Sequence, residues 1–145
     1  MRAVIQRVKQ ASVTVEGKSV GSIDKGFLVL LGVHRDDAKQ NADALAKKCT
    51  DLRIFSDAED RMNLSLLDIK GEALVVSQFT LYADCSKGRR PSFIHAAPPE
   101  KGNALYQYFV SRMRLLIPRV ETGVFGAIME VSLVNNGPVT IILEE

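Results

Sequence analysis

The first third of the chain is a series of apolar or alternating segments separated by turns of only two or three residues. Residues 11–16 alternate apolar and polar side chains, which is the period-two pattern of a strand with one buried face. Gly17-Lys18 makes a hairpin-length turn into residues 19–23, and Asp24-Lys25-Gly26 makes a second turn. Residues 27–33 are a nearly continuous apolar run, typical of a strand covered on both faces. This spacing predicts a sheet whose first strands are joined by hairpins.

Two later segments have the apolar spacing of amphipathic helices. Asp37 followed by Gln40 resembles a capping box at the start of the first helix. Pro98-Pro99 can begin the second helix, because proline is tolerated in the first turn, and Pro118 ends it. The predicted buried stripes are Ala38, Ala42, Leu45, Cys49 and Leu52 on the first helix, and Leu105, Phe109, Met113 and Leu116 on the second.

Strands are also predicted at residues 1–8, 53–55, 73–76, 128–134 and 139–143, and the last two flank Asn135-Asn136-Gly137-Pro138. No βαβ series is apparent, and neither the Gly-x-Gly-x-x-Gly nor the Walker pattern occurs, which weighs against a nucleotide-dependent enzyme. The expected fold class is α+β: a single domain of residues 1–145, with a mostly antiparallel, barrel-like β-sheet and two packed helices.

Composition and charge exclude several classes of protein. Apolar residues make up 46% and charged residues 25%, with a net charge of +2, as in an ordinary folded domain. Cys49, Cys85, His34 and His95 lie at no ligand spacing, so we expect neither a metal nor a cofactor. No segment approaches the ~20 apolar residues of a membrane span. Charges occupy the N-terminal residues where a signal peptide would be apolar, so the expected compartment is the cytoplasm.

Three segments carry candidate chemistry. Ser77-Gln78-Phe79-Thr80-Leu81 ends an apolar strand, where backbone N–H groups can stabilise a developing oxyanion. Asn136–Thr140 places a proline at the entry to a strand, where its missing N–H is tolerated. Lys87–Phe93 mixes basic residues with glycine and an aromatic ring, which suits phosphates and a stacked base. Taken alone, the same segments also fit a solvent-facing strand end, a hairpin turn and a flexible surface loop.

In this order, the three segments resemble the D-aminoacyl-tRNA deacylase family. Residues 77–81 and Gly137-Pro138-Val139-Thr140 match its two signature motifs intact. A related branch with relaxed chirality replaces the Ser and Phe of the first motif, and this chain keeps Ser77 and Phe79. Supporting matches extend the resemblance over nearly the whole chain: Ile5-Gln6-Arg7-Val8, residues 11–15, 30–33 and 53–57, Arg90-Pro91-Ser92-Phe93 and residues 131–135.

The resemblance implies a homodimer that hydrolyses the ester of D-aminoacyl-tRNA, rejects L-aminoacyl-tRNA and has both active sites at the subunit interface. It implies that Gly137 and Pro138 of one subunit enter the partner's pocket through a cis peptide bond and exclude L-side chains. The pocket holds the 3′-terminal adenosine and its amino acid. A wall that excludes side chains leaves glycine unaffected, so Gly-tRNA is an expected substrate. The implied catalytic residues of the pocket are Ser77, Gln78, Phe79 and Thr80.

Further roles follow from the resemblance and from the residues that the motifs lack. Arg7 is expected to brace the Gly-Pro segment, and Lys87, Arg89 and Arg90 to contact tRNA. Neither motif contains a histidine or a carboxylate, so we expect water to attack directly, with N–H groups near residues 79 and 80 polarising the carbonyl.

The residues alone leave two alternatives open. One is a covalent esterase that uses Thr80 or Cys85 with His34 or His95. The other is a module that binds tRNA without cleaving it, through its basic loop.

Overall fold

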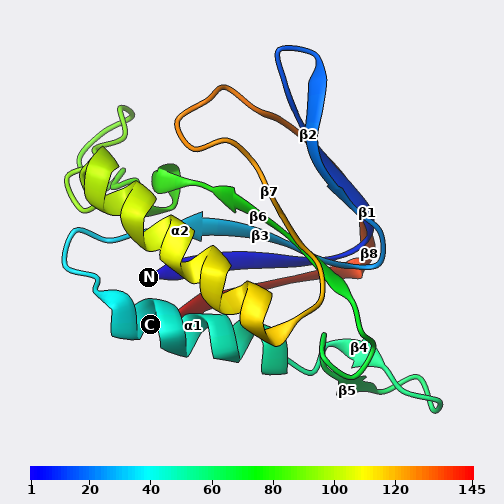
Figure 1. Cartoon of the computed structure of the whole chain (residues 1–145). Helices are drawn as coiled ribbons and strands as arrows, with labels where there is room; N and C mark the ends of the chain where they lie inside the picture. The colour runs from blue at the N-terminus through cyan, green and yellow to red at the C-terminus, as the bar shows by residue number, and fades with distance from the viewer.

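The structure, a computed structural model, describes residues 1–145 and contains one six-stranded sheet, in which β8 pairs with β1 outside the main order β2-β1-β3-β6-β7. The sheet strands are β1 (Arg2–Val15), β2 (Lys18–Ile23), β3 (Gly26–Gly32), β6 (Glu72–Ser77), β7 (Val120–Thr122) and β8 (Glu130–Glu144). A separate two-stranded sheet consists of β4 (Phe55–Ser56) and β5 (Met62–Leu64). The helices are α1 (Lys39–Asp51), the 3-10 helix η1 (Phe79–Tyr82) and α2 (Pro99–Leu116). Figure 1 shows α1 and α2 together on one side of the curled sheet, which confirms the predicted α+β class.

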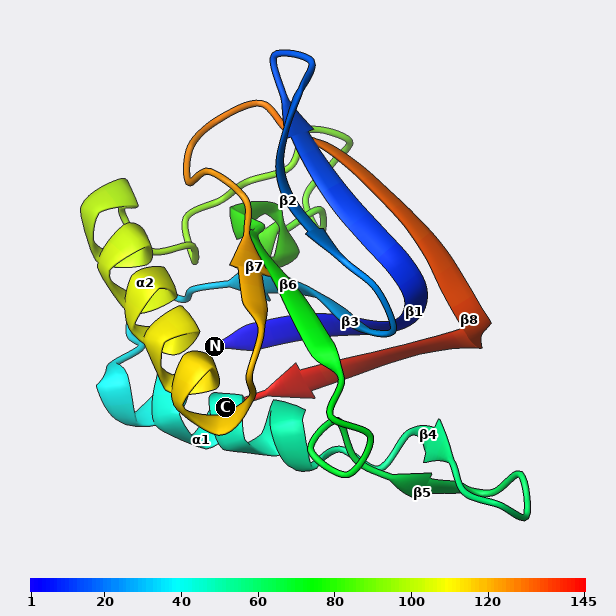
Figure 2. The ribbon, with the colours of Figure 1, turned by 45° about the vertical axis from the view of Figure 1, so that its right-hand side comes forward.

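β1 and β8 are single long strands that run side by side and bend together (Figure 2). The predictions of two strands in residues 1–15 and two in residues 128–143 are therefore wrong. The pairing extends from Arg2 opposite Glu144 to Thr14 opposite Glu130, so no hairpin turn forms at Asn135–Pro138. Instead, the register shifts on either side of Val8. Extra residues on one strand of a pair form a bulge, which bends the strand without ending it.

Two strand pairs in the sheet are parallel, contrary to the expected absence of βαβ units. β3 pairs with β6 and β6 pairs with β7, and their connections contain α1 and α2, respectively. The β4–β5 hairpin interrupts the first connection, and the loop of residues 83–98 interrupts the second. These interruptions, and the three-residue length of β7, hide the alternation of strands and helices in the sequence.

The central strands separate two apolar cores. Phe27 and Val29 pack beneath α1 and α2, whereas Leu28 and Leu74 face a smaller cluster on the opposite side of the sheet. Residues 27–33 are thus covered on both faces, as predicted. Cys49 lies in the larger core, where burial raises the pKa of its thiol to about 12 and keeps it protonated.

The helix ends differ from the predicted ones at two residues. Asp37 does not cap α1: the N-cap is Ala38, whose N–H donates to Asn41 Oδ1 at 2.9 Å. The Asp37 carboxylate instead accepts the N–H of His34 at 2.6 Å. Leu116, predicted to be buried, is 41% exposed because it lies at the last residue of α2. Neither helix has the length and apolar composition that crossing a bilayer would require.

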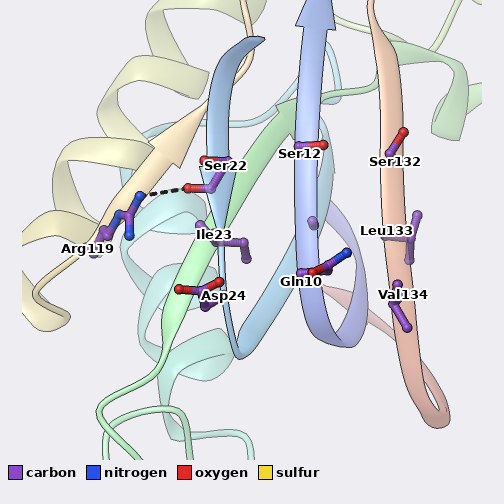
Figure 3. A pocket seen from close by; sticks show the side chains of 10 residues that line it. Gln10, Ser12, Ser22, Ile23, Asp24, Arg119, Ser132, Leu133 and Val134 are labelled. Atoms are coloured by element: carbon purple, nitrogen blue, oxygen red, sulfur yellow. Dashed lines mark hydrogen bonds between the residues drawn. The ribbon is translucent and has the colours of Figure 1, made fainter.

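Arg119 ties together strands at opposite ends of the sheet order. Its Nη2 donates to the Ser22 carbonyl of β2 at 3.0 Å, its Nη1 to Glu72 of β6 at 3.1 Å and its Nε to Glu121 of β7 at 3.2 Å. Figure 3 shows the bond to Ser22 beside a groove of about 300 Å³ between β2, β1 and β8. Hydrogen bonds to the two carboxylates raise the pKa of Arg119 above its ordinary value. The guanidinium therefore helps to close the barrel-like sheet.

We predict that Arg119→Ala lowers the free energy of unfolding, because one bond to a backbone carbonyl and two exposed ion pairs are removed. Urea unfolding followed by circular dichroism measures the change. Arg61→Ala is the matched control, since Arg61 pairs only with exposed Glu59 near the β4–β5 turn. Equal destabilisation of the two variants would show that Arg119 does not close the sheet.

Candidate active site

A cavity of about 720 Å³ opens at the C-terminal end of β6. Eleven of its 17 lining residues are hydrophobic, and the few polar groups lie where β6 meets η1, a composition typical of small-molecule sites. The lining residues are Val33, Val76, Ser77, Gln78, Phe79, Phe93, Ile94, Ala96, Ala97, Pro98, Pro99, Gly102, Phe125, Gly126, Ala127, Met129 and Val131.

Two backbone donors without a protein acceptor lie at the start of η1, whose first residue, Phe79, lines this cavity. The N–H of Gln78 donates to the Leu31 carbonyl at 2.8 Å, and the N–H of Leu81 donates to the Gln78 carbonyl at 3.2 Å. Between them, the N–H groups of Phe79 and Thr80 donate to no atom of the chain. They are the first two amides of η1, and the first amides of a helix have no partner within it. Adjacent free amides of this kind can bind a carbonyl oxygen and stabilise an oxyanion.

The polar side chains around these donors form no nucleophile–base pair. Ser77 lines the cavity as the last residue of β6, and the Gln78 amide donates to the Thr80 hydroxyl. The rings of His34 and His95 stack on one another, with centroids 5.9 Å apart, and neither is hydrogen-bonded to these side chains. The geometry therefore supports no histidine-activated hydroxyl.

The other reactive groups near the cavity form no catalytic pair or metal site either. Cys85 is an exposed free thiol, and no group of three His, Cys, Asp or Glu side chains is placed to hold a metal ion. Burial, with a smaller contribution from the Asp37 charge, raises the pKa of Tyr82 to about 12, so its phenol is neutral at physiological pH. The polar groups that remain at the start of η1 are its backbone N–H donors.

The loop between η1 and α2 connects the basic cluster to the cavity. Phe93 lines the cavity and packs edge-on against Phe79, with ring centroids 4.9 Å apart. An antiparallel bridge between residues 84 and 92 closes the base of the loop. Three basic side chains in this loop are exposed and form no ion pair: Lys87, Arg89 and Arg90.

The second motif lies at the bend of β8, where Gly137 and Pro138 are exposed and joined by a cis peptide bond. Buried Arg7 lies opposite on β1 and donates from Nε to the Asn136 carbonyl at 2.8 Å and from Nη1 to the Ile54 carbonyl. Gly137 has a φ of +143°, and a Cβ there would lie 3.0 Å from Arg7 Nη2. Glycine is thus required both by the backbone conformation and by the close approach of Arg7.

Within one chain, the two motifs lie far apart. Thr140 of β8, Leu28 of β3 and Leu74 of β6 lie in one row of paired residues across the sheet, with β1 between β8 and β3. Ser77 lies three residues beyond this row on β6, and Pro138 lies two residues before it on β8, which runs in the same direction. At about 3.3 Å per residue this is roughly 16 Å along the strands, with β1 and β3 also between them. A single chain does not bring the two motifs into one site.

The cavity wall formed by the β7–β8 connection and α2 was not among the residues that the sequence patterns indicated. It includes Phe125 and Met129, together with Gly102, whose missing side chain leaves space beside the Phe125 ring. An available signal was the position of Phe125 between Gly123 and Gly126 in a connecting segment, since binding residues occur disproportionately in loops.

Comparisons with known proteins agree with the resemblance of the motifs. The model of the D-Tyr-tRNA(Tyr) deacylase family matches residues 4–144. The chain is 62% identical to a D-aminoacyl-tRNA deacylase of Desulfatibacillum aliphaticivorans, over 99% of each chain. It is 60% identical to one of Thermosipho africanus, over 99% of this chain and 97% of the relative.

Solved structures show the same fold. A c-Myc DNA unwinding element binding protein superposes with a TM-score of 0.95 at 39% identity, over 100% of this chain and 99% of that one. A probable eukaryotic D-amino acid tRNA deacylase shares the fold, with a TM-score of 0.83 at 21% identity, over 99% of this chain and 98% of that one. The family model and the relatives together confirm the resemblance drawn from the motifs, and the chain belongs to the D-Tyr-tRNA(Tyr) deacylase family.

Proposed function

We propose that the protein hydrolyses the ester between a D-amino acid and the 3′ end of tRNA, releasing the free amino acid and tRNA and sparing L-aminoacyl-tRNA. The observation that carries this proposal is the pair of free amides at Phe79 and Thr80 beside an apolar cavity of about 720 Å³. Relatives about 60% identical over nearly the full length bear the name of this activity. Residues 1–145 act as a single domain in the cytoplasm, without a cofactor.

The cavity accommodates the two ends of such a substrate differently. Its apolar wall at Phe125 and Met129 suits the flat face of the terminal adenine. The ester carbonyl then accepts hydrogen bonds from the N–H groups of Phe79 and Thr80, which stabilise the oxyanion as water adds to the carbonyl carbon. The bond to the ribose oxygen breaks, that oxygen leaves as a hydroxyl, and the amino acid leaves as a carboxylate and a proton. Ser77, Gln78 and Thr80 position the substrate and the water.

Chirality is tested by Gly137 and Pro138 of a second subunit. Both residues are exposed at the bend of β8, and their own chain leaves them far from the cavity. A rigid segment against one side of the α-carbon rejects one hand by steric exclusion. Glycine has no side chain to exclude, so Gly-tRNA is a second substrate.

The long strand β8 supports the homodimer that this arrangement needs. β8 pairs only with β1, so its outer edge is free along all 15 residues. Val134 is 44% exposed and Ile142 is 64% exposed on this strand. Native proteins seldom leave a long apolar edge strand uncovered. In a two-fold dimer, each subunit gives its Gly137-Pro138 segment to the partner's cavity and receives one in return.

The experiment that tests the function measures hydrolysis of D-Tyr-, L-Tyr- and Gly-tRNA by the wild-type protein and by two variants of one residue. Phe79→Pro removes the N–H at a helix position that tolerates proline, whereas Phe79→Ala removes the ring and keeps the N–H. We expect wild type to hydrolyse D-Tyr- and Gly-tRNA and to spare L-Tyr-tRNA. Phe79→Pro should be slower than Phe79→Ala by about 100-fold, the usual cost of removing one oxyanion donor.

The same reactions separate the alternatives. Mass spectrometry of quenched reactions should find no acylated protein, whereas an adduct on Thr80 or Cys85 would establish a covalent esterase. Binding of all three tRNAs without ester loss would establish a non-catalytic module. Equal rates for Phe79→Pro and Phe79→Ala would show that the Phe79 amide does not take part.

Mixed dimers test whether the site is shared. In Gly137→Ala, the new Cβ would lie 2.7 Å from Val139 Cγ2 and 3.0 Å from Arg7 Nη2, so the segment must shift and L-Tyr-tRNA should be hydrolysed. Refolding this variant with excess Phe79→Pro chains should restore rejection of L-Tyr-tRNA, because the active cavity then receives an intact Gly137 from its partner. The double variant cannot supply one and is the control. Continued L-Tyr-tRNA hydrolysis at an unchanged rate per Gly137→Ala chain would place both motifs in one subunit's site.

The basic loop supplies the next prediction. Replacing Lys87, Arg89 and Arg90 by Gln should weaken binding of different tRNAs equally and reduce the slope of log affinity against log salt by up to about 3, roughly one for each phosphate that is no longer neutralised. Filter binding at several salt concentrations measures both quantities. Replacement of Lys9, Lys18 and Lys25, exposed residues in the middle of β1, at the start of β2 and just before β3, is the control for net charge. Equal weakening in both triple variants would show that the loop makes no specific contact.

A further inference from the structure

The helix η1, which carries both free amides, has little to hold it in place by itself. It is four residues long, and no side chain caps its N-terminus. Short 3-10 helices have poor hydrogen-bond geometry and depend on tertiary contacts. An oxyanion site needs donors that are fixed before the reaction, so the contacts that fix η1 bear on catalysis.

Gly32, the last residue of β3, allows η1 to lie directly against the sheet. A Cβ at this position would lie 3.1 Å from Leu81 Cβ and 3.2 Å from the Tyr82 ring. These contacts are tighter than a side chain ordinarily makes, so the absence of a side chain at Gly32 sets the depth at which η1 packs. This contact fixes the depth of η1 against the sheet and does not by itself set the orientation of the helix about its own axis.

Arg2 supplies the missing restraint from β1. Its Nη1 donates to the Leu81 carbonyl at 2.6 Å, and its guanidinium lies 5.0 Å from the centre of the Tyr82 ring. A cation suits this end of η1, where helix carbonyls lack partners. Glu144 of β8 pairs with Arg2 Nε and so restrains the guanidinium.

Tyr82 transmits this contact to the residues that precede α1 and α2. Its ring packs at 5.1 Å against that of His34, which in turn stacks on His95. A bridge between residues 34 and 96 joins the same two segments, and Ala96 lines the cavity. The contacts behind η1 thus continue into the cavity wall.

We propose that Arg2 and Tyr82 form a clamp, here called the η1 clamp, that positions the N–H groups of Phe79 and Thr80 for the reacting carbonyl. Both are positioning residues, and the proposal rests on the function proposed above. The clamp holds the C-terminal end of a four-residue helix whose N-terminal end carries the donors, so rotation at one end displaces the other. A displacement of about 1 Å at a reacting centre costs as much as 100-fold in rate.

The test compares Arg2→Met, Arg2→Lys, Tyr82→Leu and a control, Arg53→Met, in single-turnover hydrolysis of D-Tyr-tRNA. Arg53 also donates from Nε to a backbone carbonyl, that of Asn63 at 2.7 Å, but does so near β5. Arg2→Met should lower the maximal rate about 10- to 100-fold and change the half-saturating protein concentration less than about threefold. Lys can still donate to the Leu81 carbonyl, so Arg2→Lys should recover part of the rate. Arg53→Met should behave as wild type.

Amide ¹⁵N–¹H spectra report the geometry directly. The Phe79 and Thr80 signals should shift in Arg2→Met and not in Arg53→Met. Tyr82→Leu removes the ring and keeps the bond from Arg2 to Leu81, so it should lose less rate than Arg2→Met and serves if Arg2→Met does not fold. A wild-type rate in Arg2→Met and Tyr82→Leu would contradict the clamp and leave the proposed function intact. Phe79 and Thr80 signals that do not shift in Arg2→Met would do the same. A wild-type protein that does not hydrolyse D-Tyr-tRNA overturns the proposed function itself.

Discussion

The pairing of β1 along both of its edges is the constraint on which the rest of the structure depends. β8 pairs with it along one edge, and β3 and then β2 pair along the other. Its side chains also reach both signature motifs, since Arg2 contacts η1 and Arg7 contacts the Gly137-Pro138 segment. The two motifs are therefore held at a fixed separation by one strand. That separation is too large for them to meet within a chain, and for this reason the proposed site combines them across a two-fold axis.

Backbone groups carry the proposed chemistry, and this explains why the site holds no conventional catalytic group. An aminoacyl ester is already activated, so in this proposal two fixed amide donors suffice for its hydrolysis. Steric exclusion of the L-side chain then suffices for selectivity. The scaffold must therefore meet three structural requirements. A bulge exposes Gly137, and the missing side chain at Gly32 makes room for η1. Asn135 replaces the ladder hydrogen bonds that the bulge removes. The Asn135 side chain does so by accepting the Val139 N–H at 2.7 Å and donating to the Val139 carbonyl at 3.2 Å.

Local patterns in the sequence predicted the fold class, both helices and most strands, because burial and turn propensity are local. They failed where pairing is decided by a distant partner. Asn135–Pro138 has the composition of a turn, but β1 supplies partners on both sides and keeps β8 a single strand. The parallel pairs were missed for the same reason. The site was predicted through its motifs, whereas Phe125, Gly102 and Arg2 depend on contacts between segments that no local pattern records.

The proposed exchange of segments also makes selectivity a property of the interface. Each chain carries both halves of a site, so one two-fold interface completes two sites and dissociation leaves both incomplete. A lone subunit would retain the η1 donors and the cavity but lack the wall that excludes L-side chains. It would then attack the abundant L-aminoacyl-tRNA that translation requires. Under this proposal, tight association is needed for selectivity rather than for hydrolysis itself, and the 15-residue strand β8 is the edge proposed to provide it.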